Sequence, residues 1–96
     1  MMTKTEQSEA KLIKLLVLMN NKVLISQIEE VGADIGQPDC KLTKPYEVVL
    51  QEDGKLFLNR WLDGLSSEDT FMMSSDKILS LSNPTMQILD SYKGLV

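Results

Sequence analysis

Few side chains in this chain of 96 residues could do chemistry. It has no histidine and one cysteine, Cys40. A cysteine nucleophile needs an activating base, and histidine is the commonest base near neutral pH. One cysteine cannot form a disulfide within the chain, and zinc sites need more Cys and His than are present. We therefore expect no catalytic thiol, no disulfide and no metal centre.

Adjacent carboxylates occur at Glu29-Glu30 and at Glu68-Asp69. Acid-base or metal chemistry needs carboxylates that converge on one point. Neighbours in a strand point to opposite faces, so Glu29 and Glu30 should not converge. Solvated surface charges are the simpler interpretation. We expect a protein that is not an enzyme and that uses no cofactor.

The charge balance also limits the partners. Ten basic and fourteen acidic residues give a net charge of −4, which is poorly suited to nonspecific phosphate binding. A local pocket for exposed bases needs fewer cations. Tyr46 and Trp61 could stack on bases, and Lys44 and Arg60 could form a small basic patch. Aromatic residues such as Tyr46 and Trp61 more often pack in a core or an interface. Residues such as Lys44 and Arg60 more often lie on the solvated surface.

The first third of the chain predicts a helix and a hairpin. Thr3 to Glu6 has the pattern of a capping box, which predicts a short helix over 4–11. Residues 12–19 have apolar side chains at helical spacing but are also typical of a buried strand. Asn20-Asn21 suits a two-residue turn, and the Val- and Ile-rich segment 22–31 follows. A hairpin explains both sides of this turn, so a strand is favoured.

Further strands are predicted at 40–50, 56–62, 77–82 and 86–92, with turns between them. Pro45 cannot donate to a sheet, so it should lie at an edge or a bulge. Residues 63–76 are acidic and Ser-rich, and are predicted to be a long connection. Together these features predict one domain over 1–96 that is mainly β, with a small barrel or sandwich over 14–92.

A domain of this size has a thin core, because it buries only roughly two thirds of its unfolded surface. Several strands carry apolar residues on both faces, as at Leu24 and Ile25, so one face needs cover from a helix or from another copy. The longest apolar run, 15–19, is far shorter than the ~20 residues that span a bilayer. We expect a cytoplasmic protein with no membrane contact.

Two segments carry a family resemblance. Leu16 to Ile28 resembles the first Sm motif, which is an apolar strand, an Asn/Gly/Lys turn and a strongly bent strand. Ile78 to Tyr92, as two short strands around a tight turn, is similar to the second. The chain therefore resembles the Sm-like (LSm) family. The resemblance implies a short N-terminal helix, a bent five-stranded open barrel of SH3 type, and a homo-oligomeric ring of five to seven subunits.

The resemblance also implies where the ring and its ligand would be held. The fourth strand of one subunit would pair with the fifth strand of the next. The interface side chains would be Ile78, Leu79, Leu81, Met86, Ile88, Leu89 and Tyr92. Single-stranded RNA would meet two pore loops, through Gln37, Asp39 and Lys41 in the first and Ser82 and Asn83 in the second.

This sequence departs from the family in two places. The Arg-Gly or Lys-Gly usual in the second loop is absent, and Ser26 replaces the glycine usual in the bent strand. Two functions stay open: a ring that binds single-stranded RNA, and a ring-forming structural or protein-interaction module that does not.

Overall fold

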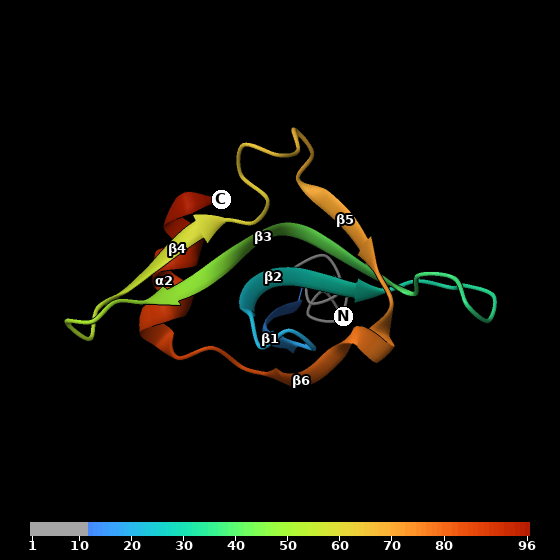
Figure 1. Cartoon of the computed structure of the whole chain (residues 1–96), viewed down its shortest axis with the longest axis horizontal. Helices are drawn as coiled ribbons and strands as arrows, with labels where there is room; N and C mark the ends of the chain where they lie inside the picture. Colours follow the sequence, from blue (N-terminus) through green and yellow to red (C-terminus); the bar gives the residue numbers. More distant parts are fainter. Residues whose placement is uncertain (1–11) are drawn as a thin grey trace, which may run out of the picture.

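The computed structural model of the chain describes residues 12–96, so the helix expected over 4–11 lies outside the described residues. The described part is mainly β, with one α-helix at its C-terminal end (Figure 1). The elements follow in the order β1 (Leu12–Leu18), β2 (Val23–Glu30), β3 (Cys40–Leu50), β4 (Leu56–Arg60), β5 (Thr70–Met73), the single 3-10 turn η1 (Ser75–Lys77), β6 (Ile78–Ser82) and α2 (Met86–Leu95).

The strands form one open antiparallel sheet in the order β4-β3-β2-β1-β6. β3 is long enough for two partners along one edge: β4 pairs with its second half and β5 with its first half. The sheet curls, so that β6 passes below β1 and β2 in the view of Figure 1. The five-stranded barrel that the resemblance implies was wrong in its number of strands, because the sheet has six and the 63–76 connection contains one of them, β5. Its residues Thr70 to Met73 pair with Cys40 to Thr43 of β3.

The predicted hairpin is confirmed, and with it the strand assignment of β1, but its turn is longer than the two residues predicted, because Met19 belongs to it together with Asn20 and Asn21. Asn21 has a φ of 67°, the left-handed conformation that Asn tolerates. The Leu18 amide donates to the Lys22 carbonyl at 2.9 Å, and the Asn20 side chain accepts from the Lys22 amide at 3.0 Å. The turn predicted between the strands at 40–50 and 56–62 is confirmed as well: it lies at Glu52-Asp53-Gly54, with Gly54 at a φ of 87°.

The sheet bends where β2 and β3 fall out of register. Ile25 pairs with Tyr46 and Gln27 with Thr43, so Ser26 faces two residues, Lys44 and Pro45. This is a β-bulge, as predicted for Pro45, and Lys44 has a φ of 53°. The buried Ser26 hydroxyl lies within hydrogen-bonding distance of two carbonyl oxygens, that of Thr43 at 3.1 Å and that of Gln27 at 2.8 Å.

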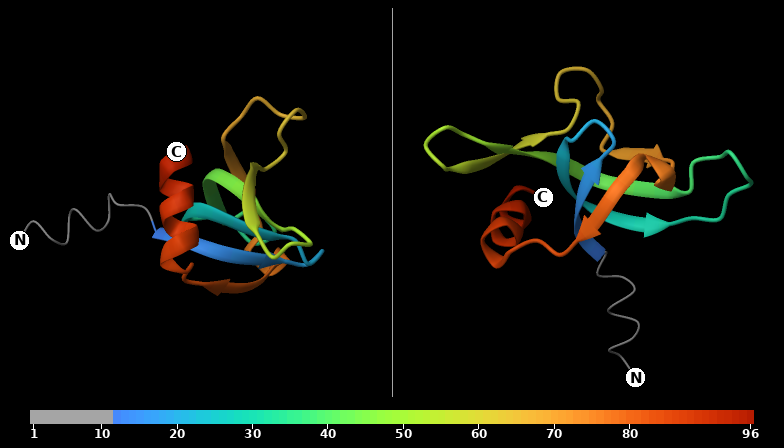
Figure 2. Two further views of the ribbon diagram at one scale, coloured as in Figure 1. Left: turned by 90° about the vertical axis from the view of Figure 1, so that its left-hand side faces the viewer. Right: turned by 60° about the horizontal axis from the view of Figure 1, so that its bottom comes forward.

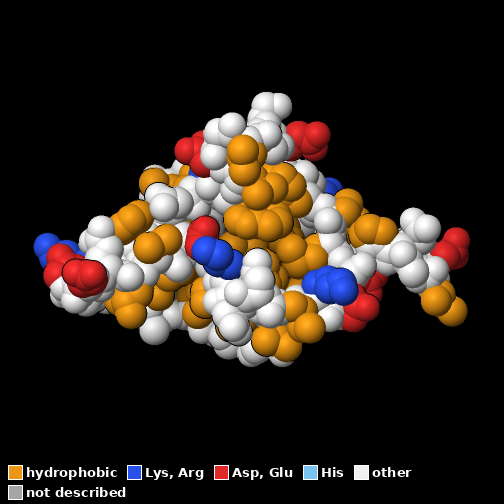
Figure 3. Space-filling view, viewed as in Figure 1, with side chains coloured by type: hydrophobic (Ala, Val, Ile, Leu, Met, Phe, Trp, Pro, Cys, Tyr) orange, Lys and Arg blue, Asp and Glu red, His pale blue; other side chains and the backbone are white. Residues whose placement is uncertain are grey.

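The core lies inside the curl of the sheet. It comprises Leu16, Leu18, Leu24, Ile28, Cys40 and Leu42, with Trp61, Met73 and Ile78 packed against it. Figure 3 shows apolar side chains reaching the surface in the middle of one face, as a thin core would predict. Trp61 meets Phe71 edge to face, with ring centroids 5.2 Å apart.

The strand predicted over 86–92 was wrong, because these residues begin α2. Thr85 caps the helix, and its hydroxyl oxygen accepts from the Ile88 amide at 3.4 Å. Apolar residues at 88, 89 and 92 share one helical face. Tyr92 is buried on the outer face of the sheet, edge to face with Tyr46 at 5.8 Å. Figure 2 shows α2 standing beside the sheet.

Candidate functional site

In the described part of the chain, the strands at the two ends of the strand order, β4 and β6, have unpaired edges, and so does the short strand β5, which pairs with β3 alone. Within residues 12–96, β6 pairs with β1 alone and β4 pairs with β3 alone. Natural proteins usually protect such edges with charged residues or proline. β6 is Ile-Leu-Ser-Leu-Ser and has no charge, and β4 has one, Arg60, at its end. The edges are therefore open to pairing with another strand.

Both edge strands present apolar side chains on the concave face. Directly paired residues of antiparallel strands point to the same face. Leu81 pairs with the core residue Leu16, so it points to the concave side. Asn59 pairs with Glu47, which pairs with the core residue Leu24, so Phe57, two positions before Asn59, also points there. Leu81 is 53% exposed and Phe57 is 39% exposed.

A groove of about 1030 Å³ lies beside β6. We call it the β6 groove. Most of its lining is apolar, with Lys14, Glu29 and Glu30 also present. The full lining is Leu12, Lys14, Ile28, Glu29, Glu30, Cys40, Ser75, Ile78, Leu79, Ser80 and Leu81. No described segment fills it.

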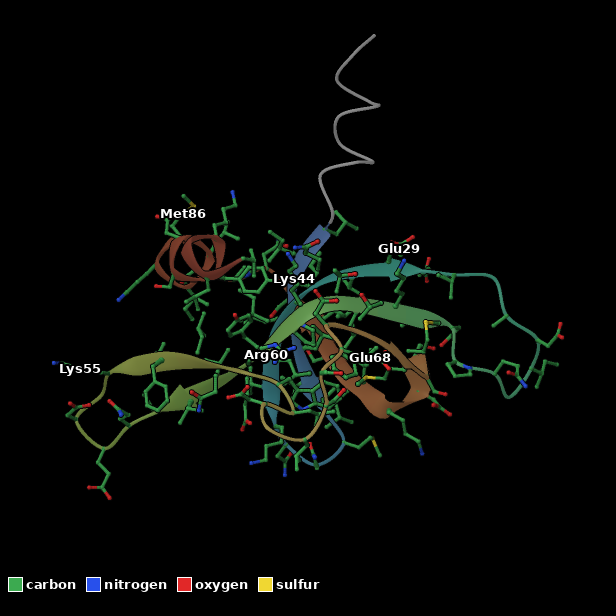
Figure 4. The ribbon with its side chains drawn as sticks, turned by 90° about the horizontal axis from the view of Figure 1, so that it is seen from above. Glu29, Lys44, Lys55, Arg60, Glu68 and Met86 are labelled. Atoms are coloured by element: carbon green, nitrogen blue, oxygen red, sulfur yellow. The ribbon has the colours of Figure 1, made fainter. Side chains whose placement is uncertain are left out.

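The end of the β3–β4 hairpin, residues 49–57, extends from the body of the protein (Figures 1 and 2). We call it the hairpin arm. On either side of its charged turn the arm carries exposed apolar side chains: Leu50 is 68% exposed and Leu56 is 44% exposed. Figure 4 shows Lys55 in this arm and Glu29, which lines the β6 groove, at opposite sides of the protein.

Of the five predicted RNA contacts, Asp39 lies beside the turn that leads into β6. Its carboxylate accepts from the Ser75 amide at 2.7 Å and from the Ser75 hydroxyl at 2.8 Å. These hydrogen bonds lower the pKa of Asp39 below its ordinary value. Lys41 follows on β3, paired with Glu29, and Gln37 lies in the exposed loop 31–39.

Ser82 and Asn83 lie at the other end of β6 from Asp39. Ser82 pairs with Leu15, and the Asn83 side-chain oxygen accepts from the Lys14 ammonium at 2.6 Å. The structure therefore does not bring the two predicted loops together. The segment beside Asp39 is instead 74–77, where the sequence predicts the end of the long connection and the start of a strand.

The predicted interface residues fall on two elements. Leu79 and Leu81 are exposed on β6, and Ile78 packs partly against the core. The other four belong to α2. Met86 is 69% exposed, Ile88 and Leu89 are half-buried, and Tyr92 is fully buried within its own chain. β4 with Phe57, which sequence reasoning missed, supplies the second free edge.

The other candidate residues, Cys40 and Arg60, are buried or bonded within the protein. Burial, and then the charges of Asp39 and Glu30, raise the pKa of the Cys40 thiol, so it is protonated at neutral pH. Arg60 donates to the Glu68 carbonyl at 3.1 Å and lies 3.5 Å from Asp63. Figure 4 shows Arg60 and Glu68 near Lys44. Among residues 12–96, no cluster of His, Cys, Asp or Glu could hold a metal ion.

Residues 11–96 match a protein family described as a Family of unknown function (DUF6561). No curated protein matches the chain. None of the helices in the described part is long and apolar enough to cross a membrane.

Proposed function

The chain belongs to this family of unknown function, and we propose that it acts by assembling head to tail into a closed homo-oligomeric ring, as its resemblance to Sm-like proteins implies. The supporting observation is that β4 and β6, the strands at the two ends of the strand order, each have an unpaired and nearly uncharged edge within the described residues. Each has five residues, so one can pair along its whole length with the other.

Pairing β4 of one copy with β6 of the next would satisfy backbone groups on both edges. The two edges are different surfaces, so the contact is heterologous and repeats from copy to copy. Such a contact gives a ring when its rotation closes, and a closed ring leaves neither the β4 edge nor the β6 edge unpaired. It would also cover Leu79, Leu81 and Phe57, which the single chain leaves exposed.

Light scattering at micromolar concentration tests this proposal. We expect a mass several times the 10.8 kDa of one chain. Leu79→Lys places a charge on the free edge of β6, where Leu79 is 57% exposed, and should yield monomers. Leu65→Lys is the matched control in a loop, 83% exposed, and should leave the oligomer unchanged. A monomeric wild type would contradict the proposal.

Binding of single-stranded RNA to this ring is a second candidate, favoured by the contact between Asp39 and Ser75. This contact joins loop 31–39 to loop 74–77, so two loops present polar side chains together. Lys41 and Lys77 flank the contact and could meet phosphates, and the Asp39 loop offers polar groups for base edges. The ring would repeat this site once per subunit.

A titration with oligo-U and oligo-A at physiological salt tests the RNA candidate. We expect saturable binding that Lys77→Ala weakens and that Lys93→Ala, on the exposed side of α2, leaves unchanged. No saturable binding at tens of micromolar would leave the ring as a structural or protein-interaction module.

A further inference from the structure

We propose that Phe57, on the hairpin arm of one copy, inserts beside Leu81 into the β6 groove of the next copy. This inference rests on the proposed ring and specifies its side-chain contact. It explains two features that a single chain leaves unpartnered, an exposed aromatic ring and a large apolar groove.

The faces of the sheet determine which side chain of the arm can reach the groove. Phe57 points to the concave face, whereas Leu56 and Leu58 alternate with it and point toward α2, as Tyr46 does. Leu81 points to the same concave face at the opposite end of the sheet and lines the β6 groove. When β4 of one copy extends the sheet beyond β6 of another, the two concave faces become continuous and Phe57 lies over the groove.

The chemistry of the two surfaces also matches. The β6 groove is lined by Leu12, Ile28, Ile78 and Leu81, and its volume of about 1030 Å³ accommodates an aromatic side chain with room for its neighbour Val49. A buried Phe contributes 150–250 Å² of apolar contact, so it is a strong anchor residue. Lys14, Glu29 and Glu30 also line the groove, giving the contact a charged component.

A chain cannot place its arm in its own groove. Lys55 in the arm and Glu29 at the groove lie on opposite sides of the protein (Figure 4), and the arm points away from the body (Figure 1). The occupant must therefore come from another copy, and the contact must be head to tail.

Disulfide cross-linking tests the contact. The background is Cys40→Ala, whose mass by light scattering is first compared with that of the wild type. In the double variant Phe57→Cys, Leu81→Cys, oxidation should link neighbouring copies into a ladder on a non-reducing gel, because adjacent strands bring such pairs within bonding distance. The control is Leu56→Cys, Leu81→Cys. Leu56 is the more exposed residue but faces α2, and should give no ladder.

The outcomes separate this inference from the ring itself. A ladder from the Phe57 pair alone supports the insertion of Phe57. An oligomeric mass without that ladder, or with an equal or stronger ladder from the Leu56 pair, overturns the insertion and leaves the ring standing. A monomeric wild type overturns the ring. If Cys40→Ala does not fold, the variants are made with Cys40 retained, and Leu81→Cys alone shows what Cys40 contributes.

Discussion

The Tyr92 hydroxyl donates a hydrogen bond of 2.7 Å to the carbonyl oxygen of Lys44, the residue at which β3 bends. The same hydroxyl lies 3.3 Å from the carbonyl oxygen of Thr43. The positive φ of Lys44 turns the backbone here, and the following Pro45 has no amide proton. Tyr92 thus connects the C-terminal helix to the bulge that curves the sheet.

Tyr92→Phe should lower the free energy of unfolding by about 1 kcal/mol, because it removes the hydroxyl from two part-buried hydrogen bonds to carbonyl oxygens while keeping the ring. Urea unfolding at one fixed protein concentration measures this, since an oligomer's stability depends on concentration. Ser91→Ala, at the adjacent exposed position, should change little. Equal stability of Tyr92→Phe and wild type would show that the hydroxyl does not hold the helix.

Alkaline pH should weaken the same contact. Burial raises the pKa of Tyr92 above its ordinary value of about 10. A raised pKa in the folded state means that this stabilisation is fully present below about pH 10 and is lost as the pH rises through the folded value. As the pH is raised from neutral to above about 10, the ordinary pKa of tyrosine, unfolding midpoints should fall more steeply for the wild type than for Tyr92→Phe. Parallel curves would contradict the assignment.

Ser26→Ala should destabilise the protein by about 1 kcal/mol, because the Ser26 hydroxyl is buried beside the Gln27 and Thr43 carbonyl oxygens at the bulge. Thermal or urea unfolding measures the change. Ser80→Ala, on the exposed strand β6, is a control for the general effect of removing a strand hydroxyl. A loss no larger than that of Ser80→Ala would mean that the bend does not need the hydroxyl.

Acid should separate the loops that Asp39 joins. Its lowered pKa means that the stabilisation is present above the ordinary value of about 3.9 and is lost as the pH falls through the folded value. Asp39→Asn should therefore be less stable than the wild type at pH 7, and the two should converge in strong acid. Hydrogen exchange of the Ser75 amide gives a local measurement. A difference that persists in strong acid would show that the charge of Asp39 is not responsible.

Much of the sheet follows from local signals in the sequence. Asn20-Asn21 and Glu52-Asp53-Gly54 have the left-handed tolerance that tight turns demand, so both hairpins were predictable. Pro45 predicted an edge or a bulge because proline cannot donate to a ladder, and the structure has the bulge. The bulge then reverses the faces of β3, so Leu42 is in the core whereas Tyr46 packs against α2. Strict alternation along a strand without a bulge would place both on one face.

Other features depend on distant contacts. Thr70 to Met73 lies in a polar segment with no strong strand signal. It forms a strand because it pairs with the edge of β3 that β4 leaves open. Residues 86–92 have β-branched and aromatic side chains, but the Thr85 cap and the packing of Tyr92 on Tyr46 favour a helix. Asp39 lies beside Ser75 at one end of β6, whereas Asn83 follows the other end. The path of β6 therefore sets which loops meet. The spacing of these residues in the sequence does not predict this arrangement.

Native mass spectrometry of the wild-type chain at micromolar concentration tests the central claim most directly, because it counts the subunits. A heterologous contact between β4 and β6 predicts one closed species with a single stoichiometry, expected at five to seven chains of 10.8 kDa. A monomer would contradict assembly. A dimer as the largest species would indicate a two-fold contact of like edges and would contradict the head-to-tail ring.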